Sequence, residues 1–150
     1  MTDKFVYVTY IRTTPEKVWE ALTKPEFTRL YWFGMHQQSD WKKGSAWNLV
    51  FSDGRIADAG AVLEVDPPKR LVLRWHNEFR PELNAEGDTR CTFVIEQEGE
   101  LVKLTVTHEA ERAPKTIEAV SGGWPRVLSS LKSLLETGAG LPRTDTPPKG

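Results

Sequence analysis

The stretch from Lys115 to Thr137 constrains the fold more than any other part of the chain. Its apolar residues recur at steps of three and four, the spacing that places side chains on one face of an α-helix. They are Ile117, Val120, Trp124, Val127, Leu128, Leu131, Leu134 and Leu135. The opposite face would meet solvent through Arg126, Ser129, Ser130, Lys132, Ser133 and Glu136. A helix of this length, roughly 33 Å at ~1.5 Å per residue, needs a broad apolar surface to cover.

The segment Gly122-Gly123-Trp124-Pro125 complicates this helix, because proline has no amide proton and its ring crowds the preceding turn. Either the helix begins with Pro125 in its first turn, or a single helix runs through with a kink. Since Ile117 and Val120 are in phase with Trp124, we favour the single helix. The two glycines either allow a backbone or ligand to approach closely or only relieve the strain caused by the proline.

The hundred residues before this helix predict a sheet. Alternating or β-branched segments, with hairpin signals at Ser52-Asp53-Gly54 and around Gly99, favour strands at 5–12, 46–51, 56–65, 70–76, 89–97 and 101–108, and a weaker signal lies at 36–40. Short helices are expected to start near Pro15 and Pro25, where proline occupies a first helical position. The loop over 77–88 is long for a hairpin, which suggests the rim of a pocket.

This order of elements predicts an α+β fold. We expect a curved antiparallel sheet of six or seven strands gripping the long C-terminal helix, with two short helices after the first strand. One domain should span residues 1–138. The tail over 139–150 has few apolar residues and is expected to be disordered.

Composition excludes several classes of function. A net charge of -1 over 150 residues provides no basic surface for nucleic acid. The sequence has no apolar run of the ~20 residues that a membrane-spanning helix requires, and it begins without a signal peptide. One cysteine, Cys91, cannot form an internal disulfide. Together these features predict a cytoplasmic protein.

Metal and cofactor binding are not predicted. The possible ligands His36, His76, Cys91 and His108 have no short ligand spacing, and the chain has no glycine-rich phosphate loop. His108 is the candidate for catalysis, because strand parity places it on the same face as Val106 and its reference pKa of ~6.5 suits acid–base chemistry. The alternative is a hydrogen-bonded structural histidine at the end of a strand.

Strand parity and helical phase also predict which side chains face the space between sheet and helix. These candidate ligand-binding residues are Trp47, Leu49, Phe51, Leu73, Trp75, Phe93, Val106, His108, Trp124, Val127 and Leu128. They would line a cavity, with His108 as its polar anchor, or they would meet and fill the core, as closely packed interiors normally do.

Four segments, in this order, carry a resemblance to a known family. They are Thr14–Thr23, Val65–Leu71, Leu104–Glu109, and Gly123-Trp124-Pro125 with the following Leu128 and Leu131. With them the chain resembles the START-like (SRPBCC, helix-grip) superfamily, and within it the family named after the activator of heat-shock-protein-90 ATPase. The resemblance implies a cavity between sheet and long helix that often holds apolar or amphipathic ligands. It implies no single reaction, because members include binders, cyclases and dehydratases.

Three hypotheses follow for the function. The first is a binding protein for an apolar or amphipathic small molecule, without a cofactor. The second is a cofactor-independent enzyme of the cyclase or dehydratase type, using His108 and a carboxylate in the same cavity. The third is a protein that contacts a chaperone through its surface. A raised carboxyl pKa in the cavity would favour the second, and a large exposed apolar patch the third.

Overall fold

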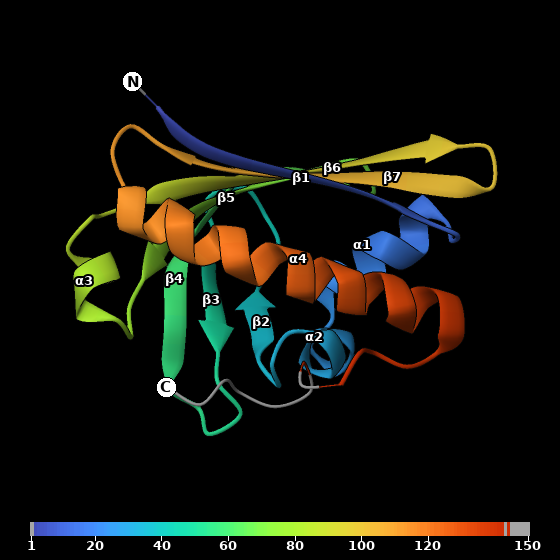
Figure 1. Cartoon of the computed structure of the whole chain (residues 1–150), viewed down its shortest axis with the longest axis horizontal. Coiled ribbons are helices and arrows are strands. Elements are labelled where there is room, and N and C mark those ends of the chain that lie inside the picture. Colours follow the sequence, from blue (N-terminus) through green and yellow to red (C-terminus); the bar gives the residue numbers. More distant parts are fainter. Residues whose placement is uncertain (1, 143, 145–150) are drawn as a thin grey trace.

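A curved antiparallel sheet and one long helix form the core of the fold (Figure 1). The computed structural model describes residues 2–142 and 144, and within them it has seven strands and four helices. The strands are β1 (Asp3–Ile11), β2 (His36–Ser39), β3 (Ala46–Val50), β4 (Ile56–Asp66), β5 (Arg70–Asn77), β6 (Thr89–Glu98) and β7 (Leu101–Ala110). The helices are α1 (Pro15–Thr23), α2 (Pro25–Tyr31), α3 (Pro81–Asn84) and α4 (Pro114–Thr137). The α+β prediction is confirmed, and the weakly signalled strand at 36–40 is the seventh.

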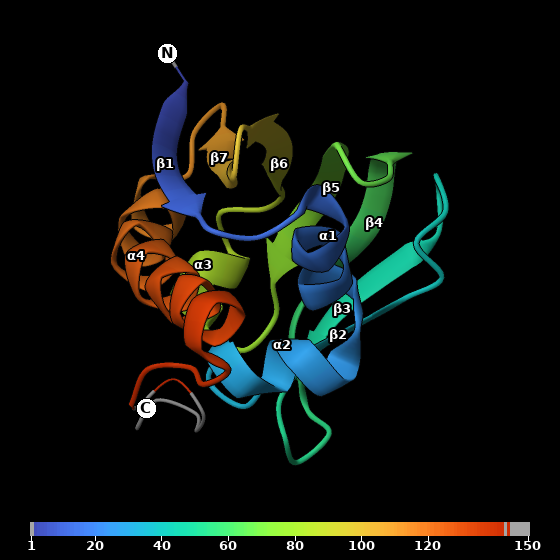
Figure 2. The same cartoon turned by 90° about the vertical axis from the view of Figure 1, so that its right-hand side faces the viewer.

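The strand order is β1-β7-β6-β5-β4-β3-β2, so the first strand pairs with the last and every neighbouring pair is antiparallel. The pairing register shifts within β3–β4 and again within β4–β5. Such irregularities bend a strand and increase its local twist. Figure 2 shows the result, a sheet that curls around the interior while α4 and α2 close its open side.

Helix α4 runs without interruption through Pro125, as the in-phase apolar pattern predicted. Its central residues Trp124, Val127, Leu128 and Leu131 are buried against the sheet. Gly138 ends the helix in the left-handed conformation (φ 90°), which costs glycine little because it has no Cβ.

The structure differs from the sequence prediction at Ser130, which is buried rather than exposed to solvent. The chain turns back after α4 and lies against it. The backbone N–H of Leu141 donates to Ser130 Oγ (2.9 Å), and Thr144 Oγ1 lies 2.6 Å from the same oxygen. The tail expected to be disordered therefore begins with a hydrogen-bonded segment, while residues 143 and 145–150 lie outside the described residues.

Gly60 of β4 allows two tryptophans from non-adjacent strands to meet. Its register partners are Trp47 on β3 and Trp75 on β5, and the two indole centroids lie only 4.4 Å apart. A Cβ on Gly60 would stand 1.7 Å from the carbonyl oxygen of Arg74, which is backbone and cannot move aside. Glycine is therefore required where the three strands approach.

We predict that Gly60→Ala lowers the free energy of unfolding by roughly 3 kcal/mol or more, at or beyond the upper end of ordinary overpacking. Gly122→Ala is the matched control. The methyl group that it adds has no atom within 4 Å, and the substitution replaces a glycine in the interior of a helix. It should be neutral or stabilising by up to ~1 kcal/mol. Urea unfolding of both variants measures the difference, and equal stabilities would contradict this account of Gly60.

Candidate functional site

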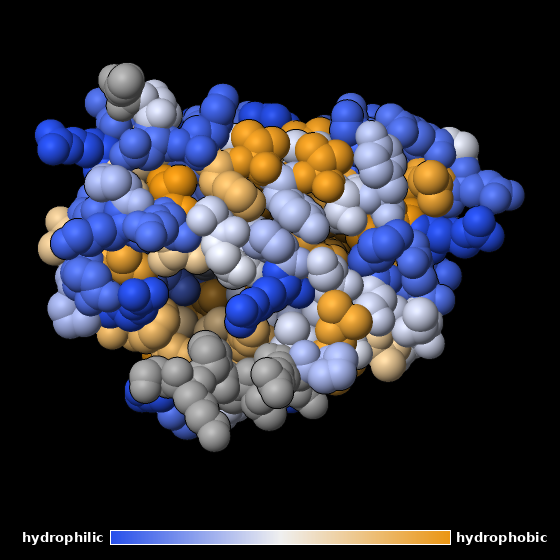
Figure 3. Space-filling model, viewed as in Figure 1, coloured by the Kyte–Doolittle hydropathy of each residue, from blue (hydrophilic) through white to orange (hydrophobic). Residues whose placement is uncertain are grey.

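A cavity of about 220 Å³ lies between the concave sheet, the N-terminal half of α4, and α3. In Figure 3 it is a hollow with an apolar floor beneath α4. It is lined by Trp32, Phe33, Met35, Leu49, Asp58, Trp75, Asn77, Phe79, Arg80, Leu83, Thr116, Ala119, Val120, Gly123, Trp124 and Val127. This volume exceeds the ~150 Å³ at which an apolar protein cavity binds benzene, and it is below the ~300–1,000 Å³ usual for drug-sized ligands.

The cavity contains some of the residues that the sequence analysis placed there. Leu49, Trp75, Trp124 and Val127 line it. The remaining seven are buried outside its lining: Trp47, Phe51, Leu73, Phe93, Val106, His108 and Leu128. Phe51 packs edge-to-face against Phe79, with 5.1 Å between the ring centroids. The other six are fully buried in the interior, so the cavity occupies only the end of this space nearest α3.

Three tryptophans from three separate elements form one wall. Trp32 follows α2, Trp75 lies on β5 and Trp124 on α4. The centroid of the Trp32 ring is 6.1 Å from that of Trp75 and 5.3 Å from that of Trp124. The ring centroids of Trp75 and Trp124 are 5.8 Å apart, and the ring planes meet at 70°. This edge-to-face arrangement suits the quadrupoles of aromatic rings. Trp32 was missed by the sequence analysis, because it comes just after a helix, where no periodicity indicates a direction.

His108 lies behind this wall in a linear chain of hydrogen bonds. Trp124 Nε1 donates to His108 Nδ1 (3.1 Å). Because an indole N–H can only donate, the neutral imidazole carries its proton on Nε2, which donates to Thr89 Oγ1 (2.7 Å). The Thr89 hydroxyl then donates to the carbonyl of Trp75 (3.2 Å). Burial lowers the pKa of His108 to about 4, so the ring is neutral at neutral pH and both nitrogens are already engaged.

Asp58 is the carboxylate that the fold brings into the cavity. It lies on β4 opposite Leu49 on one side and Asn77 on the other, and residues directly opposite share a face of the sheet. Asn77 Nδ2 donates to Asp58 Oδ1 (3.0 Å). Burial raises the pKa of Asp58 to about 7, while hydrogen bonding by Trp75 and Asn77 lowers it in part. With a pKa of about 7, the protonated and ionised forms of this carboxyl are both populated at neutral pH.

A one-residue bulge decides that Asp58 faces inward. Val50 pairs with Ile56, so an uninterrupted hairpin would pair Leu49 with Ala57. The register shift pairs Leu49 with Asp58 instead. A shift of one residue moves a side chain to the other face of the sheet. Nothing in the residue pattern indicated this bulge, which is why Asp58 was not predicted as a site residue.

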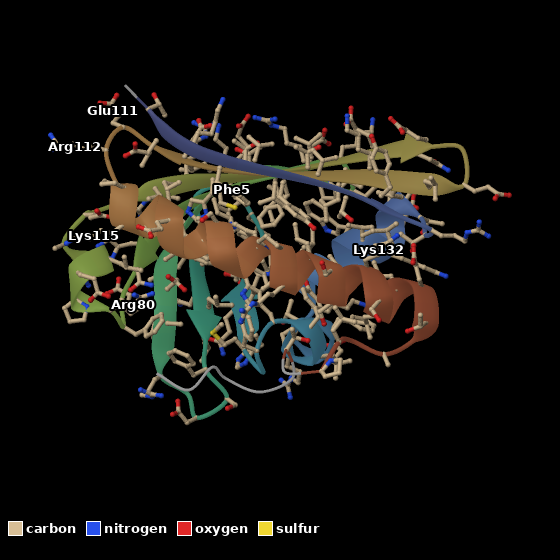
Figure 4. All side chains as sticks on the ribbon, viewed as in Figure 1. Phe5, Arg80, Glu111, Arg112, Lys115 and Lys132 are labelled. Carbon is tan, nitrogen blue, oxygen red and sulfur yellow. The ribbon has the colours of Figure 1, made fainter. Side chains whose placement is uncertain are left out.

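The loop between β5 and β6 forms the rim of the cavity, as its length suggested. Asn77 Oδ1 accepts from the backbone N–H of Arg80 (2.9 Å), and this places Arg80 beside α3 (Figure 4). His76 Nε2 lies 3.1 Å from the carbonyl oxygen of Asn84, at the end of α3. Glu86 accepts from the backbone N–H of Thr116 (2.7 Å) in the first turn of α4. The rim is therefore tied to both the sheet and the helix.

The described residues contain no cluster of three or more His, Cys, Asp or Glu side chains that could hold a metal ion. In the part of the chain that the structure covers, no helix is long and apolar enough to cross a membrane.

Comparison with known proteins places the chain in a family. The sequence profile described as "Activator of Hsp90 ATPase homolog 1-like protein" matches residues 12–136. Comparison with curated protein sequences found no significant match.

Several solved structures have similar folds. Protein MLL2253 from Mesorhizobium loti is 23% identical with a TM-score of 0.75, over 89% of this chain and 96% of that chain. The Aha1 dimer from Colwellia psychrerythraea is 20% identical with a TM-score of 0.73, over 92% and 99%. An HSP90 activator from Plasmodium falciparum is 19% identical with a TM-score of 0.71, over 88% and 95%. At these identities the likeness shows the fold alone.

We predict that Asp58→Asn becomes more stable relative to the unaltered protein as pH rises from 4 to 8. The folded-state pKa of about 7 lies above the ordinary value of 3.8, so burial of the neutral acid stabilises the protein at low pH. That contribution declines as pH rises from about 4 to about 7, by roughly 4 kcal/mol in total at most. His108 contributes the same pH dependence to the free energy of unfolding of both proteins, so its contribution cancels in the difference between them. Urea unfolding at pH 4, 5.5 and 8 measures the difference, and a pH-independent value would contradict the raised pKa.

Proposed function

Because this chain belongs to the family of activator of Hsp90 ATPase homolog 1-like proteins, with the START-like fold, we propose that its cavity binds a small, largely apolar molecule. The observation that carries the proposal is a hollow with aromatic walls that the surrounding side chains leave unfilled. Protein interiors normally close such spaces, because lost packing contacts destabilise the fold. A cavity at the surface with an apolar lining is the usual form of a small-molecule site.

The volume of the cavity sets the size and affinity of the ligand. A space of about 220 Å³ suits a molecule with a single ring. With roughly ten heavy atoms at about −0.5 kcal/mol per atom, such a ligand would gain ~5 kcal/mol, a dissociation constant on the order of 0.1–1 mM from apolar contact. A tighter ligand requires polar recognition in addition.

We predict that 2-phenylethanol, a neutral single-ring probe, binds with millimolar or better affinity and changes the tryptophan fluorescence. Ala119→Phe should weaken this binding at least tenfold, because the new ring occupies the cavity from α4. Glu118→Phe is the matched control, since Glu118 is exposed and outside the lining, and it should bind within twofold of the unaltered protein. Equal binding by all three proteins, or by none, would contradict the proposal.

A second candidate function is contact with Hsp90, which the family description and one surface feature support. Val6, Val8 and Tyr10 lie side by side on the outer face of β1, and each exposes more than two fifths of its surface. β1 is also an edge strand of the sheet, so among the described residues no strand pairs with its outer side, although Lys132 Nζ of α4 donates to the carbonyl of Tyr10.

If the surface formed by Val6, Val8 and Tyr10 contacts the chaperone, the protein should raise the ATPase rate of Hsp90 from the same organism. Val8→Asp should then reduce that stimulation several-fold. A charge there would be desolvated on contact. Gln38→Asp, exposed on the opposite edge strand β2, should stimulate normally. Stimulation that Val8→Asp leaves intact would exclude this surface, and no stimulation would exclude the function.

A further inference from the structure

We propose that the ligand of the cavity carries a protonated amine, held by Asp58, on an apolar body of single-ring size. The inference rests on the proposed function, because it names the class of molecule that the same cavity takes. It follows from three features of the site: a buried carboxylate with free acceptor capacity, a wall of indole rings, and a rim whose positive charge is already paired.

The carboxylate of Asp58 has room for another donor. The side chain is only 6% exposed, yet it lines the cavity. Its hydrogen-bonding partners are the side chains of Asn77 and Trp75. A carboxylate offers about four acceptor positions, and a buried polar group gains from filling them. An ammonium group has three N–H donors and the opposite charge, so it complements this group better than a neutral donor does.

The aromatic wall also favours a cation. Trp32, Trp75 and Trp124 line the cavity beside Asp58, and the negative face of an indole attracts an ammonium group within ~6 Å of its centroid. The same rings offer apolar contact to the remainder of the ligand. A molecule with an ammonium group at one end and a ring at the other satisfies both parts of the site.

The charges around the site do not favour an anion. Arg80 lies at the rim, where its guanidinium forms an ion pair with Glu82 (3.0 Å) and is half exposed to solvent. Near Asp58, Glu78 raises the pKa of the carboxyl and His76 lowers it, and these two side chains pair with each other (2.9 Å). An anionic ligand entering the cavity would meet the carboxylate of Asp58 in its lining.

The test compares three probes of similar shape by tryptophan fluorescence and isothermal titration calorimetry at pH 8. They are 2-phenylethylamine, its isostere 2-phenylethanol, and phenylacetate, which carries a planar carboxylate with one more heavy atom. We expect the amine to bind at least tenfold more tightly than the alcohol, and the phenylacetate anion to bind more weakly than either. The affinity for the amine should fall about tenfold per pH unit below 7, because Asp58, whose pKa is about 7, must lose its proton to bind the cation. The affinity for the alcohol should change little.

Two variants assign the preference to the carboxyl group. Asp58→Asn keeps the size of the side chain and should abolish both the preference for the amine over 2-phenylethanol and the pH dependence of amine binding. Asp88→Asn also removes one carboxylate, at a position outside the cavity lining, and should preserve the preference. These expectations are measured with the same titrations, after confirming that each variant unfolds cooperatively.

Each contrary result has a distinct meaning. If the alcohol binds as tightly as the amine, or phenylacetate binds best, the ammonium inference is overturned while the cavity remains a binding site. If the preference persists in Asp58→Asn, Asp58 is not the group that holds the amine, and the inference fails. If none of the three probes binds, both the inference and the proposed function fail.

Discussion

The position of Trp124 is the constraint on which the interior depends. Its indole N–H donates to His108, and its ring contacts Trp32, Trp75 and Phe93. The hydrogen bond fixes both the rotation of α4 and the tautomer of the histidine, because an indole N–H cannot accept. A helix turned by one residue would leave a buried donor and a buried acceptor unpaired, each at ~1–3 kcal/mol. One side chain thereby sets the wall of the cavity and the depth at which α4 lies.

The sequence predicted where the helices and strands lie better than it predicted which of their side chains face the interior. The period of α4 and the hairpin at Ser52-Asp53-Gly54 are local signals, and the structure confirms the helix and the strands they indicate. Which residues face the interior depends instead on strand register, and the bulge between β3 and β4 shifts that register next to Leu49. Parity alone therefore indicated His108 as the polar group of the cavity and overlooked Asp58. Ser130 shows the same limit, since its cover comes from a segment beyond the helix.

Two of the buried titratable groups, His108 and Asp58, have different roles because their partners differ. His108 has both nitrogens engaged by Trp124 and Thr89, so protonation would set an N–H against an N–H. Asp58 has acceptor positions that face the cavity, and its pKa lies near neutrality. A carboxyl group of this kind also meets the condition set for acid–base chemistry in the second hypothesis. Asp58, rather than His108, is therefore the group on which either binding or catalysis in this cavity would depend.

The two glycines of α4 have separate relations to the cavity. Gly123 and Ala119 line it, one turn apart on the same face of the helix, whereas Gly122 is exposed. A glycine inside a helix is less favourable than alanine by ~0.5–1 kcal/mol. Larger side chains at these two positions would reach into the hollow and fill it with apolar contacts. The small residues Ala119 and Gly123, beside the larger side chains of Trp124 and Val127, keep open a space that packing alone would close.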